Sequence, residues 1–165
     1  MLDKSARRRI LEAAWGLRGI SYDRTHRDES WKNLDRRPDK LNCSAFVCRV
    51  GCEALGYEVD TLAANAGWLL DSLADVDETV PAPGDVVGYW RKATSDEEFS
   101  TGPVTWHVMI FLGRNTVLGT SKEDDYVRVR PMDYEHTWGD RRWNLIDKTI
   151  DPSLPYRRLE LRTVR

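Results

Sequence analysis

The sequence predicts an α+β fold of the papain-like kind, in which N-terminal helices pack on a central antiparallel β-sheet. Apolar residues recur at helical spacing in the first third of the chain. In the second half, β-branched and aromatic runs alternate with turns that contain Gly or Pro. The 165 residues are the length of one ordinary domain and contain no internal repeat, so we predict a single domain over residues 1–165.

Two helices are expected near the N-terminus. The first covers residues 6–17, where apolar positions recur between arginines, and Gly19 ends it. Residues 21–40 are polar and show no period, which predicts a long loop; loops of this length in compact domains are usually functional or mobile. The second helix follows Asn42, whose side chain is a good N-cap, and ends at Gly56.

A third helix and then a series of strands complete the predicted order. The third helix is short and is expected over residues 63–73. Pro81 and the Pro83-Gly84-Asp85 run form a turn that leads into the strand VVGYW. Further strands, the first two of them joined as a hairpin, are expected at residues 106–113, 115–121 and 126–132.

Composition and charge exclude several classes of protein. Charged residues make up 32% of the chain, and no apolar run approaches the ~20 residues that a membrane-spanning helix needs. The formal net charge of -2 argues against a nucleic-acid binder, and the arginines at residues 7–9 are interpreted as a solvated face. We therefore expect no nucleic-acid and no membrane partner. The N-terminal residues lack the apolar segment of a secretory signal, so the protein is expected to be made in the cytoplasm.

The three cysteines are expected to be reduced thiols. Cys43, Cys48 and Cys52 are odd in number and clustered, which is not the pattern of a disulfide framework. No histidine accompanies them at the spacing of metal ligands, so we expect no metal site and no cofactor.

Cys43 is the candidate nucleophile, because it directly follows the predicted helix cap. Unpaired N–H groups and the helix dipole favour negative charge there, which predicts a lowered thiol pKa and a place for an oxyanion. Of the three histidines, His107 is the best candidate base because it opens a strand of the predicted sheet; the others are His26 and His136. The alternative is a packed cysteine and a hydrogen-bonded structural histidine.

Three motifs in this order resemble those of the NlpC-type cell-wall peptidases, a family of papain-like cysteine hydrolases. NCSAFV at residues 42–47 resembles the Asp-Cys-Ser-Gly-Phe/Leu-Val motif of that family. PAPGDVVGYW at residues 81–90 resembles its Pro-Gly-Asp-Leu-Val-Phe-Phe motif, and WHVMIFLG at residues 106–113 its His-Val-Gly-Ile-Tyr-Leu-Gly motif. The resemblance covers about residues 6–121, and the C-terminal extension, residues 132–165, has no clear counterpart.

The resemblance implies a role for each matching residue. Cys43 would attack a peptide carbonyl, and His107 would be the general base that later protonates the leaving amine. Asp85 would support the turn before its strand. The residues expected to contact the substrate, the first of which resembles a cleft tyrosine of the family, are Tyr22, Ser44, Trp31 and Trp106.

Three departures from the family pattern concern the site. Asn42 replaces an aspartate, which keeps the helix cap but removes a negative charge beside the thiol, and Ala45 replaces a glycine. The family orients its histidine with a polar side chain twelve residues later, where this chain has Gly119. The imidazole would then be oriented by a backbone carbonyl, by water or by Ser121, which lies two residues further on the same strand.

The reaction implied by the resemblance is hydrolysis of an amide bond in peptidoglycan stem peptides through an acyl-enzyme. Small peptidoglycan amidase toxins of type VI secretion also resemble this chain, and an exported effector with an immunity protein, a phage component or a wall-recycling enzyme would each explain a cytoplasmic start. Two alternatives remain. One is a binding or structural module of the same fold, favoured by Gly119, and the other is an acyltransferase or deamidase that acts on a protein partner.

Overall fold

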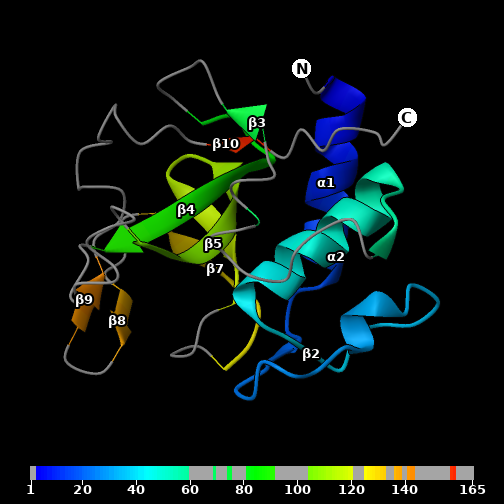
Figure 1. The fold of residues 1–165 in the computed structure, drawn as a ribbon. Coiled ribbons are helices and arrows are strands. Elements are labelled where there is room, and N and C mark those ends of the chain that lie inside the picture. Colours follow the sequence, from blue (N-terminus) through cyan, green and yellow to red (C-terminus); the bar gives the residue numbers. More distant parts are fainter. Residues whose placement is uncertain are drawn as a thin grey trace.

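The structure, a computed structural model, describes residues 3–59, 69, 74–75, 81–91, 104–120, 125–132, 136–138, 141–143 and 157–158. Figure 1 shows the two longer helices together on one side of a β-sheet. The helices are α1 (Lys4–Gly16), the short 3-10 helix η1 (Ser30–Lys32) and α2 (Cys43–Leu55). The strands are β1 (Ser21–Tyr22), β2 (Lys40–Leu41), β3 (Ala74–Asp75), β4 (Asp85–Arg91), β5 (Val104–Gly113), β6 (Thr116–Gly119), β7 (Arg128–Pro131), β8 (His136–Trp138), β9 (Arg141–Trp143) and β10 (Arg157–Arg158).

Helix α1 begins two residues earlier than the predicted Ala6, because Asp3 caps it. The carboxylate of Asp3 accepts a hydrogen bond from the amide of Ala6 at 2.7 Å, which satisfies one of the unpaired N–H groups of the first turn. One face of the helix is buried, and it carries Ala6, Ile10 and Ala14. Gly19 follows with φ of +86°, a left-handed conformation that glycine adopts without strain.

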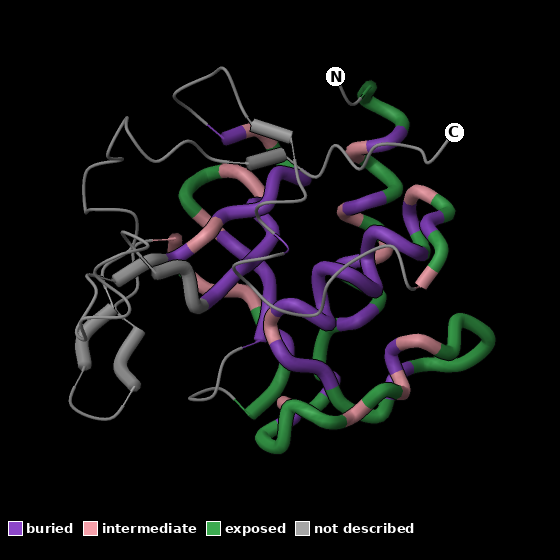
Figure 2. Tube along the Cα trace, viewed as in Figure 1, coloured by how far each residue is buried: buried purple, intermediate pink, exposed green. Residues whose placement is uncertain are grey.

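The predicted loop over residues 21–40 contains two short strands that the sequence pattern did not show. β1 and β2 pair in parallel, with Tyr22 beside Leu41. This pairing places the entry to α2 next to the start of the loop. Figure 2 shows that much of the loop surface is exposed, in contrast to the adjoining helix α2.

Helix α2 has the boundaries that the sequence predicts. The side-chain oxygen of Asn42 accepts from the amide of Ala45 at 2.8 Å and from the hydroxyl of Ser44 at 3.0 Å. At the other end, Gly56 adopts φ of +73° and donates to the carbonyl of Cys52. Most of the helix is buried, so α2 is the central helix of the core.

The sheet has the strand order β3-β10-β4-β5-β6-β7, and each of its neighbouring pairs is antiparallel. This confirms the predicted α+β class. The hairpin of β5 and β6 turns at Arg114 and Asn115, both with positive φ, as expected from the sequence. From β4 to β6, the residues that pack in one cluster with the helices are Val86, Val108, Ile110 and Leu118.

The C-terminal extension contributes to this sheet. β10 lies between β3 and β4, with Arg157 opposite both Asp75 and Val86. β8 and β9 form a separate two-stranded ladder. Part of residues 132–165 therefore completes the sheet beside β4, which no motif in the sequence indicated.

The arginine cluster at residues 7–9 is not a purely solvated face. The guanidinium of Arg7 donates to Asp85 Oδ1 at 2.8 Å and to the carbonyl of Pro83 at 2.9 Å. Arg9 donates to the carbonyl of Ala54 on α2. The interpretation of these residues as a solvated face is thus wrong for Arg7, because the packing of α1 brings its side chain against the turn, whereas Arg8 and Arg9 are exposed.

Some predictions fall on residues that lie outside the described part of the chain. Of the predicted third helix, only Leu69 is described; it is helical and buried in the core cluster. The connection after β4 and residues 121–124 lie outside as well. Within the described residues, no helix has both the length and the apolar character needed to cross a membrane.

Candidate active site

Cys43 is the first residue of α2, and its thiol lies against the strand that carries His107. α2 packs on β5. The backbone of Val108, the residue directly after His107, hydrogen-bonds to the sulfur of Cys43, as does the backbone of Ser44. The sulfur therefore sits between the first turn of the helix and the strand.

Burial raises the pKa of the Cys43 thiol, and the backbone hydrogen bonds from Val108 and Ser44 offset this only in part. The prediction of a lowered pKa is therefore wrong. The helix start does lower the pKa of a thiol, but the loss of water around the sulfur raises it by more. A thiol in this position is neutral at neutral pH and needs a base to become a nucleophile.

His107 lies within β5 and is 3% exposed. It is paired in the β4–β5 ladder with Tyr89, and the two ring centroids are 5.4 Å apart with an interplanar angle of 53°. The hydroxyl of Tyr89 donates to the carbonyl of Met132 at 3.3 Å. The imidazole is thus held in a packed environment beside a second aromatic ring.

The position twelve residues after His107 has no room for a side chain. A β-carbon built on Gly119 would stand 2.9 Å from Cγ of Met109, which is fully buried. No side chain at this position orients the imidazole, because there is none and Met109 fills the space. The alternative Ser121 lies outside the described residues.

The residues expected to contact the substrate have different surroundings. Tyr22 is half-buried beside Leu41, and its hydroxyl lies 3.3 Å from Nε2 of His26. Ser44 is 4% exposed and bonds to the cap residue Asn42, which gives it a structural role at the helix start. The side chain of Trp106 is outside the described part.

The expectation that Trp31 forms a wall of the cleft is wrong. The side chain is 3% exposed and belongs to the core cluster. The surrounding sequence is polar, but η1, which carries Trp31, packs on α2, and the ring lies in the core. A polar sequence context therefore did not indicate an exposed residue here.

Sequence reasoning missed Arg49, a buried arginine on α2. Its guanidinium pairs with Glu53 one turn away, and its remaining donors reach the backbone carbonyls of residues 31, 33, 34 and 36 at 2.7–3.4 Å. Arg49 is 2% exposed, and these bonds hold the loop against the helix that begins with Cys43. The available signal was a lone arginine in the otherwise apolar first turns of a helix.

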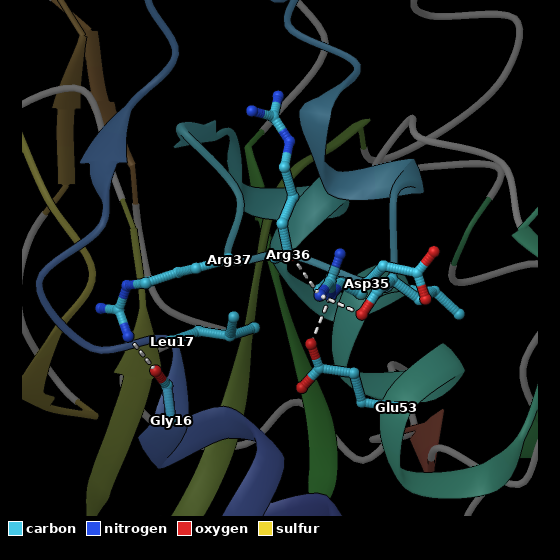
Figure 3. A pocket seen from close by; sticks show the side chains of 8 residues that line it. Gly16, Leu17, Asp35, Arg36, Arg37 and Glu53 are labelled. Carbon is cyan, nitrogen blue, oxygen red and sulfur yellow. Dashed lines mark hydrogen bonds and ion pairs between the residues drawn. The ribbon is translucent and has the colours of Figure 1, made fainter.

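A pocket of about 340 Å³ lies at this junction, between the end of α1, the loop and α2 (Figure 3). Its arginines bind protein groups: Arg37 donates to the carbonyls of Gly16 and Arg18, and Arg36 pairs with Asp39. Cys43 and His107 do not line it. Among the described residues, no group of His, Cys, Asp and Glu is arranged to hold a metal ion.

Comparison with known proteins gives matches among solved structures. The NlpC/p60 domain of the peptidoglycan hydrolase SagA superposes with a TM-score of 0.53 at 19% identity, over 76% of this chain and 88% of that one. RipD from Mycobacterium tuberculosis, described as a non-catalytic NlpC/p60 protein adapted to peptidoglycan binding, gives 0.55 at 16% identity, over 86% and 98%.

A Staphylococcus aureus protein of the NLP/P60 family, described as similar to lipoprotein, gives a TM-score of 0.59 at 17% identity. That match covers 96% of this chain and 42% of the other, so this chain spans less than half of that relative. No family model and no curated protein matches the sequence. The structural matches show that the chain has the NlpC/p60 fold, which confirms the resemblance seen in the sequence at the level of the fold.

Proposed function

We propose that the protein is a thiol hydrolase that cleaves an amide bond in the stem peptides of peptidoglycan, with Cys43 as nucleophile and His107 as base. The observation that carries the proposal is the contact of the Cys43 sulfur with the backbone of Val108, next to His107. The start of a helix favours a thiolate, and a histidine on the adjacent strand can serve as its base. The fold shared with the peptidoglycan hydrolase SagA supports the substrate class.

The first half of the reaction forms an acyl-enzyme. Because the Cys43 thiol is neutral at rest, its proton passes to His107 as the sulfur attacks the carbonyl carbon. The negative charge on the carbonyl oxygen is stabilised by backbone N–H groups at the start of α2. The C–N bond then breaks, and the imidazolium gives its proton to the leaving amine.

The second half returns the enzyme to its starting state. His107, neutral again, takes a proton from water as the water oxygen attacks the thioester carbon. The C–S bond breaks, the carboxylic acid leaves, and the proton returns from the imidazolium to the sulfur of Cys43. No cofactor takes part in either half.

A test needs product identification and two variants. Purified protein is incubated with muropeptides, and new amine and carboxyl termini are identified by mass spectrometry. Cys43→Ala and His107→Gln should each abolish product formation, and Arg8→Ala, a change of an exposed arginine on α1, should leave it unchanged. Equal product from Cys43→Ala would exclude the thiol mechanism.

A second candidate function is peptidoglycan binding without catalysis. The observation that favours it is Gly119 with Met109 above it, which leaves no third polar side chain at that position. RipD, with the same fold, is described as non-catalytic and adapted to peptidoglycan binding. Co-sedimentation with intact cell-wall sacculi, combined with no product from any muropeptide, would support this function instead.

A further inference from the structure

The packing on the β6 side of the histidine strand determines which residues can hold the imidazole. In the β5–β6 ladder, Ile110 pairs with Leu118, so the preceding Met109 lies opposite Gly119. The side chain of Met109 fills the space above Gly119, with Cγ 2.9 Å, Cβ 3.4 Å and Cε 3.5 Å from the place of a β-carbon. A polar group that orients His107 therefore does not come from residue 119.

The β4 side presents an aromatic ring instead. Tyr89 is the ladder partner of His107, and the centroids of the two rings are 5.4 Å apart. Tyr89 is fully buried and His107 nearly so, which leaves neither ring much freedom to change rotamer. The phenol ring is also fixed at its far end, because its hydroxyl donates to the carbonyl of Met132, just after β7.

The pairing of strands β4 and β5 becomes irregular next to Tyr89 and His107. The register of β4 and β5 shifts between Tyr89 and Trp90, so that His107 pairs with Tyr89 while Trp90 pairs with Thr105. Such irregularities redirect side chains and are frequent beside active sites. The ring contact of Tyr89 and His107 thus lies where the ladder stops being regular.

We propose that Tyr89 is the positioning residue for the His107 imidazole, which it holds by ring packing from strand β4. This inference rests on the proposed role of His107 as the base of a thiol hydrolase. The hydroxyl of Tyr89 acts at a distance, by fixing the ring through Met132. Met109 fills the space above Gly119, so no side chain at residue 119 takes this part.

The test compares Tyr89→Leu, which removes the ring, Tyr89→Phe, which removes only the hydroxyl, and Val87→Ala as a control. Val87 is also fully buried on β4 and pairs with Met109, so its change removes volume from the same sheet while both rings stay in place. The readouts are kcat and KM on muropeptides and the ring nitrogen signals of His107 in NMR spectra. The His107 signals are assigned by their loss in His107→Gln.

Tyr89→Leu should lower kcat roughly 10- to 100-fold and leave KM within about twofold, because a displaced base slows the chemical step without weakening binding. Its His107 ring signals should shift or broaden, whereas those of Val87→Ala should match the unmodified protein. Tyr89→Phe should lower kcat and shift the His107 ring signals in the same direction but by less. If Tyr89→Leu does not fold, the Tyr89→Phe variant tests the positioning role.

Two results separate this inference from the proposed function. If the unmodified protein forms no product, the proposed function fails, and the NMR signals still decide whether Tyr89 holds the ring. If the protein is active but the Tyr89 variants behave like Val87→Ala in both kcat and ring signals, the positioning role is overturned while the proposed function stands.

Discussion

The sulfur of Cys43 is hydrogen-bonded to the backbone of Val108, which joins the first turn of α2 to the strand that carries His107. The capped start of the helix thereby contacts strand β5 at Val108, a residue 65 positions after Cys43 in the chain. The same contact places the thiol in a site where burial dominates its ionisation. Burial, which this contact offsets only in part, therefore determines the ionisation of the thiol.

The first prediction concerns the pH dependence of thiol reactivity. Because burial raises the pKa of Cys43 above its ordinary value of 9.0, the reactive thiolate is scarce at neutral pH. Alkylation of Cys43 by iodoacetamide should accelerate by about tenfold per pH unit between about pH 7 and 9, without levelling. Mass spectrometry of the peptides separates Cys43 from the other two thiols. A rate that is constant from pH 6 to 8 would show a thiolate already formed at rest.

The second prediction concerns stability in alkaline solution. Burial raises the pKa of Cys48 to about 12, against an ordinary value of 9.0 in the unfolded chain. Between these values the unfolded state binds fewer protons than the folded state, so the free energy of unfolding falls as pH rises. The contribution of one such group is about 1.4 kcal/mol per pH unit.

Urea denaturation at pH 8.5 and 10.5 measures this effect. Cys48→Ala should lose less stability between the two pH values than the unmodified protein, because it has one buried thiol fewer. Val50→Ala is the control, since it removes volume from the same buried helix without removing a titrating group and should keep the original pH dependence. If Cys48→Ala and the unmodified protein showed the same pH dependence, the raised pKa of Cys48 would not be the cause of the alkaline loss of stability.

The third prediction concerns the buried guanidinium of Arg49. Arg49→Ala removes the donors of four backbone carbonyls between residues 31 and 36 and leaves the carboxylate of Glu53 without this partner. The free energy of unfolding should fall by about 3–5 kcal/mol. Arg49→Lys should not restore it, because an ammonium cannot reproduce the fork of five donors.

Limited proteolysis gives an independent measurement of the Arg49 change. Trypsin should cut after Arg36 faster in Arg49→Ala, because the loop is no longer held against α2. Arg8→Ala, at a 74% exposed side chain, is the control and should change neither stability nor cleavage. Unchanged cleavage in Arg49→Ala would mean that other contacts hold the loop.

The fourth prediction concerns the pair of Met109 and Gly119. Gly119→Ala should lower the free energy of unfolding by about 1–3 kcal/mol, because its methyl group meets Met109 at 2.9 Å. In a Met109→Ala background the same change should cost less than about 1 kcal/mol. Gly16→Ala, where no atom lies within 4 Å of the new methyl group, is the control and should not destabilise. Equal costs in both backgrounds would show that Met109 is not the obstacle.

The parts of the fold that depend on neighbouring residues were predictable from the sequence. The cap at Asn42 and the end at Gly56 give α2 its boundaries, because both act within one turn of the chain. The Arg114-Asn115 turn fixes the hairpin for the same reason. The three motifs indicated the fold and the candidate nucleophile and base, since they carry the residues at which helix and strand meet.

The surroundings of the site were decided by contacts between distant segments. No local pattern indicates that Arg7 reaches Asp85, that Trp31 is covered by the fold or that Met109 fills the space above Gly119. The pKa of Cys43 is raised rather than lowered for the same reason. A helix start favours a thiolate wherever it occurs, but the water that remains around the sulfur depends on what the rest of the chain packs against it.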